Sequence, residues 1–477
     1  MRIKSAMTKN MKIAFHGAAR TVTGSKHLVT LSNGKKFLLD CGMFQGMGSD
    51  TEPLNRNWGF NPAEVDYVFL SHAHVDHSGL LPKLVKDGFH GKIYATPATI
   101  DIIQALLLDS AAIQQQDILF MNKQRREEGR KLLEPLYTEE DVRNIYPYLR
   151  PVHYHQAIKV DDNIVIEFLD VGHIVGSASI FLTLTENGKM TKLAFSGDVG
   201  RYGDPILHSP EIFPQADVII IESTYGNKLH GNIETYAGDL LKNIEQTCLH
   251  KKGKLIIPAF SVGRTQELLY SLNDLELDKK LPPVDYYVDS PLSIKITEIV
   301  KRHPECFNKS VQKLLRTDND PFYFRGLRYI TDKRDSQALN TNFKPSVIIS
   351  ASGMAEAGRV KHHIANSIEN WRNTIMIIGY CEPSSLGARL KAHPEEVGIF
   401  GERFKVKADI VTLDSMSAHA DYNDLSQYLA CQDPQEVKRM FIVHGEPDVQ
   451  VEFKRRLMKK GFLDIDIPEL HQEFGLG

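Results

Sequence analysis

The sequence predicts an α/β protein of two domains, with the second domain inserted into the first. At 477 residues, the chain exceeds the length that one hydrophobic core usually serves. Strand-like segments that end in His or Asp occupy the N-terminal part and return near the C-terminus, whereas strands and helices alternate between them. We place the boundaries at 1–226, 227–415 and 416–477, and we expect the first and last segments to form one domain.

The composition is that of an ordinary globular protein, with 42% hydrophobic and 25% charged residues. No apolar run is long enough to span a bilayer and the first residues lack a signal-peptide core, so we expect a cytoplasmic protein without a membrane partner. The five cysteines include no Cys-x-x-Cys pair, which argues against both a disulfide framework and a thiolate zinc site. Any metal must therefore be bound by His and carboxylate side chains.

The formal net charge of −3 gives no overall attraction for nucleic acid. Two basic runs stand out, Lys123-Gln124-Arg125-Arg126 and Lys454-Arg455-Arg456-Leu457-Met458-Lys459-Lys460. Both lie in segments with helical spacing, and such runs are more often solvated helix faces than binding patches.

The motif Ser71-His72-Ala73-His74-Val75-Asp76-His77-Ser78-Gly79 carries most of the functional signal. It follows an apolar run that predicts a buried strand over 65–70 and precedes helical spacing over 80–85. His72 and His74, two apart in extended backbone, point to one side, while Asp76 and His77 fall on the first helical turn. One loop could therefore supply ligands to two metal ions.

Other strands of the first domain also end in polar residues. Alternating apolar residues predict a hairpin around Asn33-Gly34, whose second strand ends at Asp40, a residue suited either to orienting a metal ligand or simply to ending a strand. Helical spacing from Ala98 to Tyr137 predicts a pair of helices. Later strands end at His173 and at Asp198, as a two-metal centre on a β-sandwich requires.

The segment after Glu222 changes character. Strands over 254–258, 285–288, 346–350 and 375–378 are each followed by a Gly- or Ser-bearing turn. Strand-turn-helix units of this kind predict a parallel sheet flanked by helices. The pattern of the N-terminal segment, with strands that end in His or Asp, returns after about Lys405. Ser417-Ala418-His419-Ala420-Asp421 opens a helix, and a strand over 441–443 ends at His444.

These motifs together resemble the β-CASP group of metallo-β-lactamase-fold nucleases, which includes the endonuclease of eukaryotic mRNA 3′-end processing and ribonucleases of bacteria and archaea. Besides the motifs above, Glu222-Ser-Thr-Tyr-Gly, Pro258-Ala-Phe-Ser-Val-Gly-Arg-Thr-Gln-Glu and Val-His444-Gly-Glu-Pro match in order and spacing. The resemblance implies an αββα metallo-β-lactamase sandwich with an inserted α/β β-CASP domain. It also implies that single-stranded RNA is hydrolysed in the cleft between the two domains.

The resemblance also implies a role for each matching residue. His72, His74 and His173 would bind one Zn²⁺, Asp76, His77 and His444 would bind a second, and Asp198 would bridge the two. His419 would protonate the leaving oxygen, Glu222 would orient His419, and Asp76 would serve both catalysis and metal binding. Asp40 would orient a metal ligand. Ser417, Arg264 and Ser385 match positions that contact substrate phosphate.

The chain departs from the family in one loop and leaves alternatives open. Where the family often has Gly-Tyr-Gln-Ala-Glu-Gly-Thr-Leu-Gly-Arg, this chain has Ser384 in place of the second Gly and Ala388 in place of the Arg. The alternatives are a hydrolase of another ester, a catalytically silent RNA-binding subunit and a DNA-directed relative. The sequence also leaves open a homodimer and the choice between endonuclease and exonuclease.

Overall fold

A computed structural model describes residues 10–231, 236–379, 381–413 and 417–476. The chain divides into two compact units. The first comprises residues 1–202, 209–229 and 419–477, and the second comprises 203–208 and 230–418. The unit boundaries differ from those predicted from the sequence: 203–208 and 416–418 fall in the second unit, and 227–229 fall in the first.

The first unit contains two seven-stranded β-sheets. In spatial order, the first sheet contains β22 (Glu473–Gly475), β1 (Lys12–Phe15), β2 (His27–Thr30), β3 (Lys36–Leu39), β4 (Tyr67–Phe69), β5 (Lys92–Ala95) and β6 (Leu149–Pro151). The second contains β21 (Ile465–Asp466), β20 (Arg439–Ile442), β11 (Val218–Ile221), β10 (Lys189–Phe195), β9 (Ala178–Glu186), β8 (Ile164–Asp170) and β7 (Ile158–Lys159).

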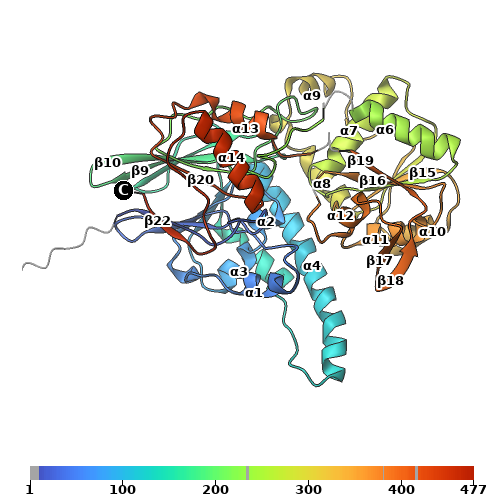
Figure 1. Cartoon of the computed structure of the whole chain (residues 1–477), viewed down its shortest axis with the longest axis horizontal. Helices are drawn as coiled ribbons and strands as arrows, with labels where there is room; N and C mark the ends of the chain where they lie inside the picture. Colours follow the sequence, from blue (N-terminus) through green and yellow to red (C-terminus); the bar gives the residue numbers. More distant parts are fainter. Residues whose placement is uncertain (1–9, 232–235, 380, 414–416, 477) are drawn as a thin grey trace, which may run out of the picture. The chain divides into compact units, whose positions relative to one another are not determined.

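The two sheets face each other across one hydrophobic core, and helices cover their outer sides. Phe15, Phe37 and Phe69 of the first sheet pack in this core with Phe168 and Phe195 of the second. Figure 1 shows α13 (Tyr422–Tyr428) and α14 (Pro447–Lys459) on one outer side, and α1 (Thr51–Arg56), α3 (Leu81–Lys86) and α4 (Pro97–Glu127) on the other. The predicted αββα sandwich is confirmed.

Strand β11 shows why a strand of this sandwich has consecutive apolar residues. Val218 and Ile220 contribute to the core between the sheets, whereas Ile219 and Ile221 pack in a second core with side chains of α13 and α14. Successive side chains of a strand point to opposite faces. A strand covered on both faces therefore needs an unbroken apolar run such as Val-Ile-Ile-Ile.

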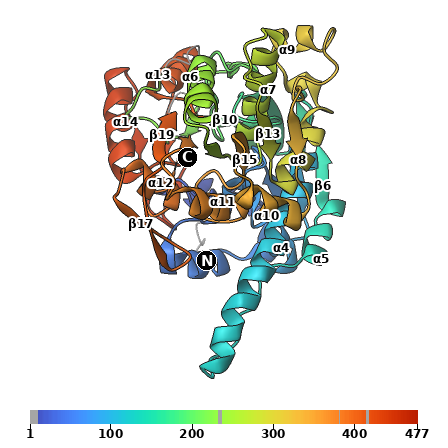
Figure 2. The ribbon, with the colours of Figure 1, turned by 90° about the vertical axis from the view of Figure 1, so that its right-hand side faces the viewer.

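The predicted pair of helices between Ala98 and Tyr137 is wrong. A single helix of 31 residues, α4, spans Pro97–Glu127, and the chain then returns without helix until α5 (Glu139–Arg143). No Gly or Pro interrupts the chain between Ala98 and Glu128, and Gly129 is the first residue suited to ending a helix. Figures 1 and 2 both show α4 extending away from the sheets of its unit. No helix among the described residues has the length and apolar character to cross a bilayer.

The second unit contains a six-stranded sheet whose neighbouring strands all run parallel, as predicted. Its strands, in spatial order, are β14 (Leu327–Tyr329), β13 (Asp285–Val288), β15 (Ser346–Ser350), β12 (Lys254–Pro258), β16 (Thr374–Ile378) and β19 (Asp409–Leu413). The helices are α6 (Tyr236–Ile244), α7 (Arg264–Leu277), α8 (Pro291–Val300), α9 (Lys309–Leu314), α10 (Lys333–Thr341), α11 (Arg359–Ser367) and α12 (Leu386–Lys391). A separate hairpin joins β17 (Glu396–Ile399) to β18 (Glu402–Lys405).

Candidate metal centre

The strands of the first unit bring most of the predicted site residues to one place. β10, β11 and β20 are mutually parallel, and β8 runs parallel to β10 because each pairs antiparallel with β9. Their C-terminal ends therefore lie at the same edge of the sheet, where His173, Asp198, Glu222 and His444 follow. His72 and His74 follow β4 of the facing sheet.

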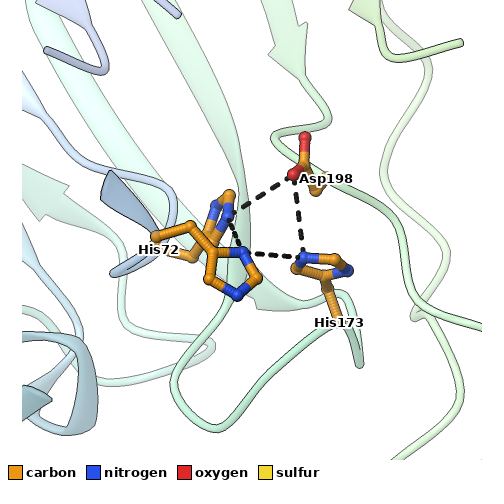
Figure 3. Close-up of side chains that lie close together, drawn as sticks. His72, His173 and Asp198 are labelled. Atoms are coloured by element: carbon orange, nitrogen blue, oxygen red, sulfur yellow. Dashed lines mark hydrogen bonds and ion pairs between the residues drawn. The ribbon is translucent and has the colours of Figure 1, made fainter. Parts of the chain in front are cut away.

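The first group of ligand atoms consists of three imidazole nitrogens and a carboxylate oxygen. His72 Nε2 lies 3.1 Å from His74 Nδ1, and His173 Nε2 lies 3.2 Å from the same atom. Asp198 Oδ2 lies 3.5 Å from His72 Nε2 and 3.6 Å from His173 Nε2 (Figure 3). A tetrahedral zinc ion with Zn–N distances of about 2.0–2.1 Å keeps its ligand atoms about 3.3–3.4 Å apart. The spacing of this group thus fits a zinc ion.

The second group shares Asp198 with the first. His77 Nε2 lies 3.2 Å from His444 Nε2, and His444 Nε2 lies 3.4 Å from Asp76 Oδ2. Asp198 Oδ2 lies 3.2 Å from His77 Nε2. Asp198 Oδ1 is buried and accepts no hydrogen bond from the described part of the chain. A buried carboxylate oxygen without a donor is costly in a metal-free protein, and a cation beside it would remove the cost.

Hydrogen bonds behind the histidines orient their free ring nitrogens towards the site. His77 Nδ1–H donates to Asp40 Oδ2 at 2.6 Å, and Asp40 also accepts from the backbone N–H of Ser71. Nδ1 of His72 lies 3.0 Å from Ser71 Oγ, and Nδ1 of His444 lies 3.0 Å from Thr224 Oγ1. With a proton on Nδ1, each ring has its lone pair on Nε2, the atom that faces the site.

The charge state of the histidines also suits metal binding. Burial lowers the pKa of His72 well below its ordinary value and lowers the pKa of His74 to about 4, so both rings are neutral. Burial lowers the pKa of His77 as well, but the carboxylates of Asp198, Asp40 and Asp76 outweigh burial and raise it well above 6.5. Without a metal ion, a proton on His77 thus balances part of the buried negative charge, and an ion would take over that role.

Glu222 and His419 form a pair beside the two groups. His419 Nδ1 lies 3.2 Å from Glu222 Oε1 and 3.9 Å from Asp198 Oδ2. The Glu222 carboxylate is held by the backbone N–H groups of Val199 and Thr224, and it is fully buried. The ligand-type atoms of Glu222 and His419 also lie close to those of Asp198 and His444, so this pair adjoins the second group.

The remaining predicted residues belong to the second unit. Arg264 is buried at the first position of α7 and pairs with Glu267. Ser385 caps α12, because its Oγ accepts from the backbone N–H of Ala388 at 3.1 Å. Ser417 is buried. In the loop that departs from the family pattern, Tyr380 lies outside the described residues.

Sequence reasoning missed the groups that support the ligands, among them Ser71, Thr224 and Lys26. Ser71 and Thr224 lie within the motifs that contain site residues, and this closeness in sequence is the only signal that could have suggested their supporting role. The Lys26 ammonium is completely buried, donates to the carbonyl oxygens of Gly24 and Gly42 at 2.9 and 2.8 Å, and lies over the ring of Phe44. It thereby joins two loops that pack against the backbone of Asp76 and His77.

We expect Lys26 to make stability depend on pH. Burial lowers its pKa from 10.5 to about 7, so between these values the unfolded chain binds a proton that the folded chain does not. Stability should then rise with pH across this window, by up to about 1.4 kcal/mol per pH unit. Urea unfolding of the chelated protein from pH 7 to 9.5 would measure this slope.

The Lys26→Met variant should lack this contribution to the slope. The Lys26→Arg variant keeps its charge at these pH values, so it should also lack this contribution although it retains hydrogen-bond donors. Comparing the two variants therefore separates the effect of titration from the loss of the hydrogen bonds. Equal slopes in all three proteins would contradict the expectation.

Three family models match the chain, and together they span most of it. They are the metallo-beta-lactamase superfamily over residues 23–247, the Beta-Casp domain over 265–390, and a Zn-dependent metallo-hydrolase RNA specificity domain over 403–468. A crystal structure of a protein of unknown function from Enterococcus faecalis shares the fold, with a TM-score of 0.53 at 13% identity over 98% of this chain and all of that one.

Curated relatives match over nearly the same length. "Ribonuclease TTHA0252" of Thermus thermophilus is 34% identical over 94% of this chain and 97% of its own. "RNase J-like protein" of Methanocaldococcus jannaschii is 28% identical over 94% and 95%, and "Transcription termination factor FttA" of Methanosarcina mazei is 27% identical over 94% and 69%. The chain therefore belongs to the β-CASP family of metallo-β-lactamase-fold nucleases.

Proposed function

We propose that this protein is a zinc-dependent ribonuclease that hydrolyses phosphodiester bonds of single-stranded RNA. The observation that carries the proposal is the pairing of His419 with the buried Glu222, beside two groups of metal-ligand side chains that both contact Asp198. A metal centre alone would suit many ester hydrolases. A histidine positioned by a buried carboxylate adds a proton donor, which an alkoxide leaving group needs.

Seven side chains would hold two zinc ions. His72, His74 and His173 would bind one ion, Asp76, His77 and His444 the other, and Asp198 would contact both. Zinc in such a site supplies a Lewis acid that activates water and neutralises charge on phosphate. The proposal includes the number of ions, their identity as zinc and the seven metal ligands. It also includes Asp40 as the residue that orients a metal ligand, and Ser417, Arg264 and Ser385 as contacts to the substrate phosphate.

The names of the relatives support RNA as the polymer. One relative is named a ribonuclease and another RNase J-like, and both align over more than nine-tenths of this chain. The alternative of another ester substrate is less well supported, because it assigns no task to the Glu222–His419 pair. The predicted homodimer and cytoplasmic location remain predictions.

The proposal is tested with the purified protein and end-labelled single-stranded RNA and DNA of one sequence. We expect RNA to be cleaved, cleavage to stop after removal of metal by a chelator, and zinc to restore it. Labels at the 5′ and 3′ ends in separate reactions would distinguish internal cleavage from cleavage at an end. Cleavage that persists in the metal-free protein would contradict the proposal, as would a zinc-loaded protein that leaves RNA intact.

A further inference from the structure

The outer half of α4 and the chain that returns from it form an arm with its own internal contacts. Asn122 forms two hydrogen bonds with Leu133, as Nδ2–H donates to the carbonyl at 2.9 Å and Oδ1 accepts from the backbone N–H at 2.8 Å. Arg125 Nε–H donates to the carbonyl of Lys131 at 2.7 Å. These bonds hold the return segment against one face of the helix. We call Leu119–Leu133 the arm tip.

Outside these contacts, which we call the clasp, the helix carries large exposed side chains. Gln116, Leu119, Phe120, Lys123 and Arg126 follow the spacing i, i+3, i+4, i+7 and i+10, which places them on one side of a helix. All five are exposed, with Leu119 at 72% and Phe120 at 80%. Such exposure contributes nothing to the core, and exposed apolar groups rimmed by polar ones mark interaction sites.

The charge of the arm tip indicates the partner. The tip has five basic residues and two acidic ones, a net charge of +3, whereas the whole chain has −3. Arg125 is occupied by the clasp and Arg130 pairs with Glu128, whereas Lys123, three residues on from Phe120, and Arg126, three residues on from Lys123, remain as exposed cations of the helix. Single-stranded nucleic acids bind where aromatic rings stack on bases and cations contact phosphates.

The base of the same helix is tied to the loop that carries His173. Thr96 and Thr99 both donate their hydroxyl groups to the carbonyl of Gly176, at 2.6 and 2.8 Å. From Thr99 to Phe120 the helix rises by about 31 Å, at 1.5 Å per residue. A rigid helix thus connects the edge of the metal centre to the exposed face at the tip.

We propose that the arm tip is a second binding site for single-stranded RNA, separate from the metal centre. A base stacks on Phe120, and Lys123 and Arg126 contact the neighbouring phosphates. The identity of the polymer rests on the proposed function. Because the tip lies far along the helix from the centre, an RNA long enough to reach both gains affinity, and a short one does not.

The test uses Phe120→Ala and Lys123→Glu in the full chain. Loss of one stacked base typically costs about 1–3 kcal/mol, so Phe120→Ala should weaken binding of an RNA of about 30 nucleotides by roughly tenfold. Lys123→Glu should also lower the salt dependence of binding by about one phosphate contact. Fluorescence anisotropy of labelled RNA in the chelated protein measures both effects without cleavage.

Two controls match these variants. Phe343→Ala removes an aromatic ring that is 90% exposed in the second unit, and Lys189→Glu reverses an exposed charge at the start of β10. Both should bind the long RNA like the unchanged protein. Phe120→Ala and Lys123→Glu should bind an RNA of about five nucleotides normally and hydrolyse bis-nitrophenyl phosphate at the normal rate.

Each outcome separates this proposal from the proposed function. If the protein cleaves no RNA but the arm variants still weaken binding of long RNA, the ribonuclease proposal fails and the arm site stands. If all variants bind long RNA equally, the arm proposal is overturned. It is also overturned if the arm variants leave RNA binding unchanged and alter only the oligomeric state measured by sedimentation, because the tip would then contact another protein chain.

Discussion

Replacing Asp198 with alanine is expected to remove most of the bound metal and nearly all RNA hydrolysis. The unchanged protein should carry about two zinc ions per chain, since His72, His74 and His173 gather on one side of Asp198 and Asp76, His77 and His444 form a second group. Asp198 Oδ2 lies within 3.6 Å of His72, His77 and His173, so its loss affects both groups. Elemental analysis after gel filtration would measure the metal content, and end-labelled RNA the activity.

A matched control lies at the other end of the same strands. Asp217 precedes β11, and its carboxylate accepts from the backbone N–H of Lys192 at 2.7 Å, far along β10 from Asp198. Asp217→Ala should therefore keep its metal. Circular dichroism of the chelated proteins would show whether each variant folds. A folded Asp198→Ala protein that retains two zinc ions would refute the shared-ligand assignment.

Much of the site could be predicted because strand ends are visible in sequence. Apolar runs mark where buried strands stop, and the polar residue after each run is easy to identify, as with His173 after β8 and His444 after β20. Sequence alone does not say which strand ends meet. That follows from the sheet order, in which β20 and β10 flank β11 although they are distant in the chain.

The features that sequence could not predict depend on contacts between distant residues. Lys26 reads as a surface lysine, and only the fold shows it buried between the carbonyl groups of Gly24 and Gly42. The clasp between Asn122 and Leu133 likewise explains why the chain after α4 returns without forming a second helix. Helical spacing between Ala98 and Tyr137 therefore indicated the helix α4 but not the non-helical return, which depends on tertiary contacts.

Removing the His419 side chain should slow RNA hydrolysis by about 10²–10⁴-fold and leave the metal content unchanged, as expected for loss of a positioned general acid. With Nδ1–H donating to Glu222, the proton for the leaving oxygen would come from the other ring nitrogen, Nε2. Burial lowers the pKa of His419, but the carboxylates of Glu222 and Asp198 outweigh burial and raise it, which favours the protonated form that a general acid needs.

Leaving-group dependence distinguishes this role from a structural one. A nitrophenolate leaves without a proton, so His419→Ala should lose far less activity on bis-nitrophenyl phosphate than on RNA. Glu222→Gln should show the same pattern more mildly, because it removes only the charge that holds the imidazole. His155, with a side chain that is 61% exposed in the same unit, provides a control replacement that should change neither rate.

The zinc content of the His419→Ala protein must be measured as well, because His419 lies close to metal-ligand side chains. His419 lies in a group with Asp198, Glu222 and His444 whose atoms are close enough to bind an ion. If His419→Ala loses zinc, the side chain is a ligand. If zinc stays but both substrates slow equally, His419 supports the site without transferring a proton. The general-acid role requires retained zinc together with a deficit that is large for RNA and small for the nitrophenyl ester.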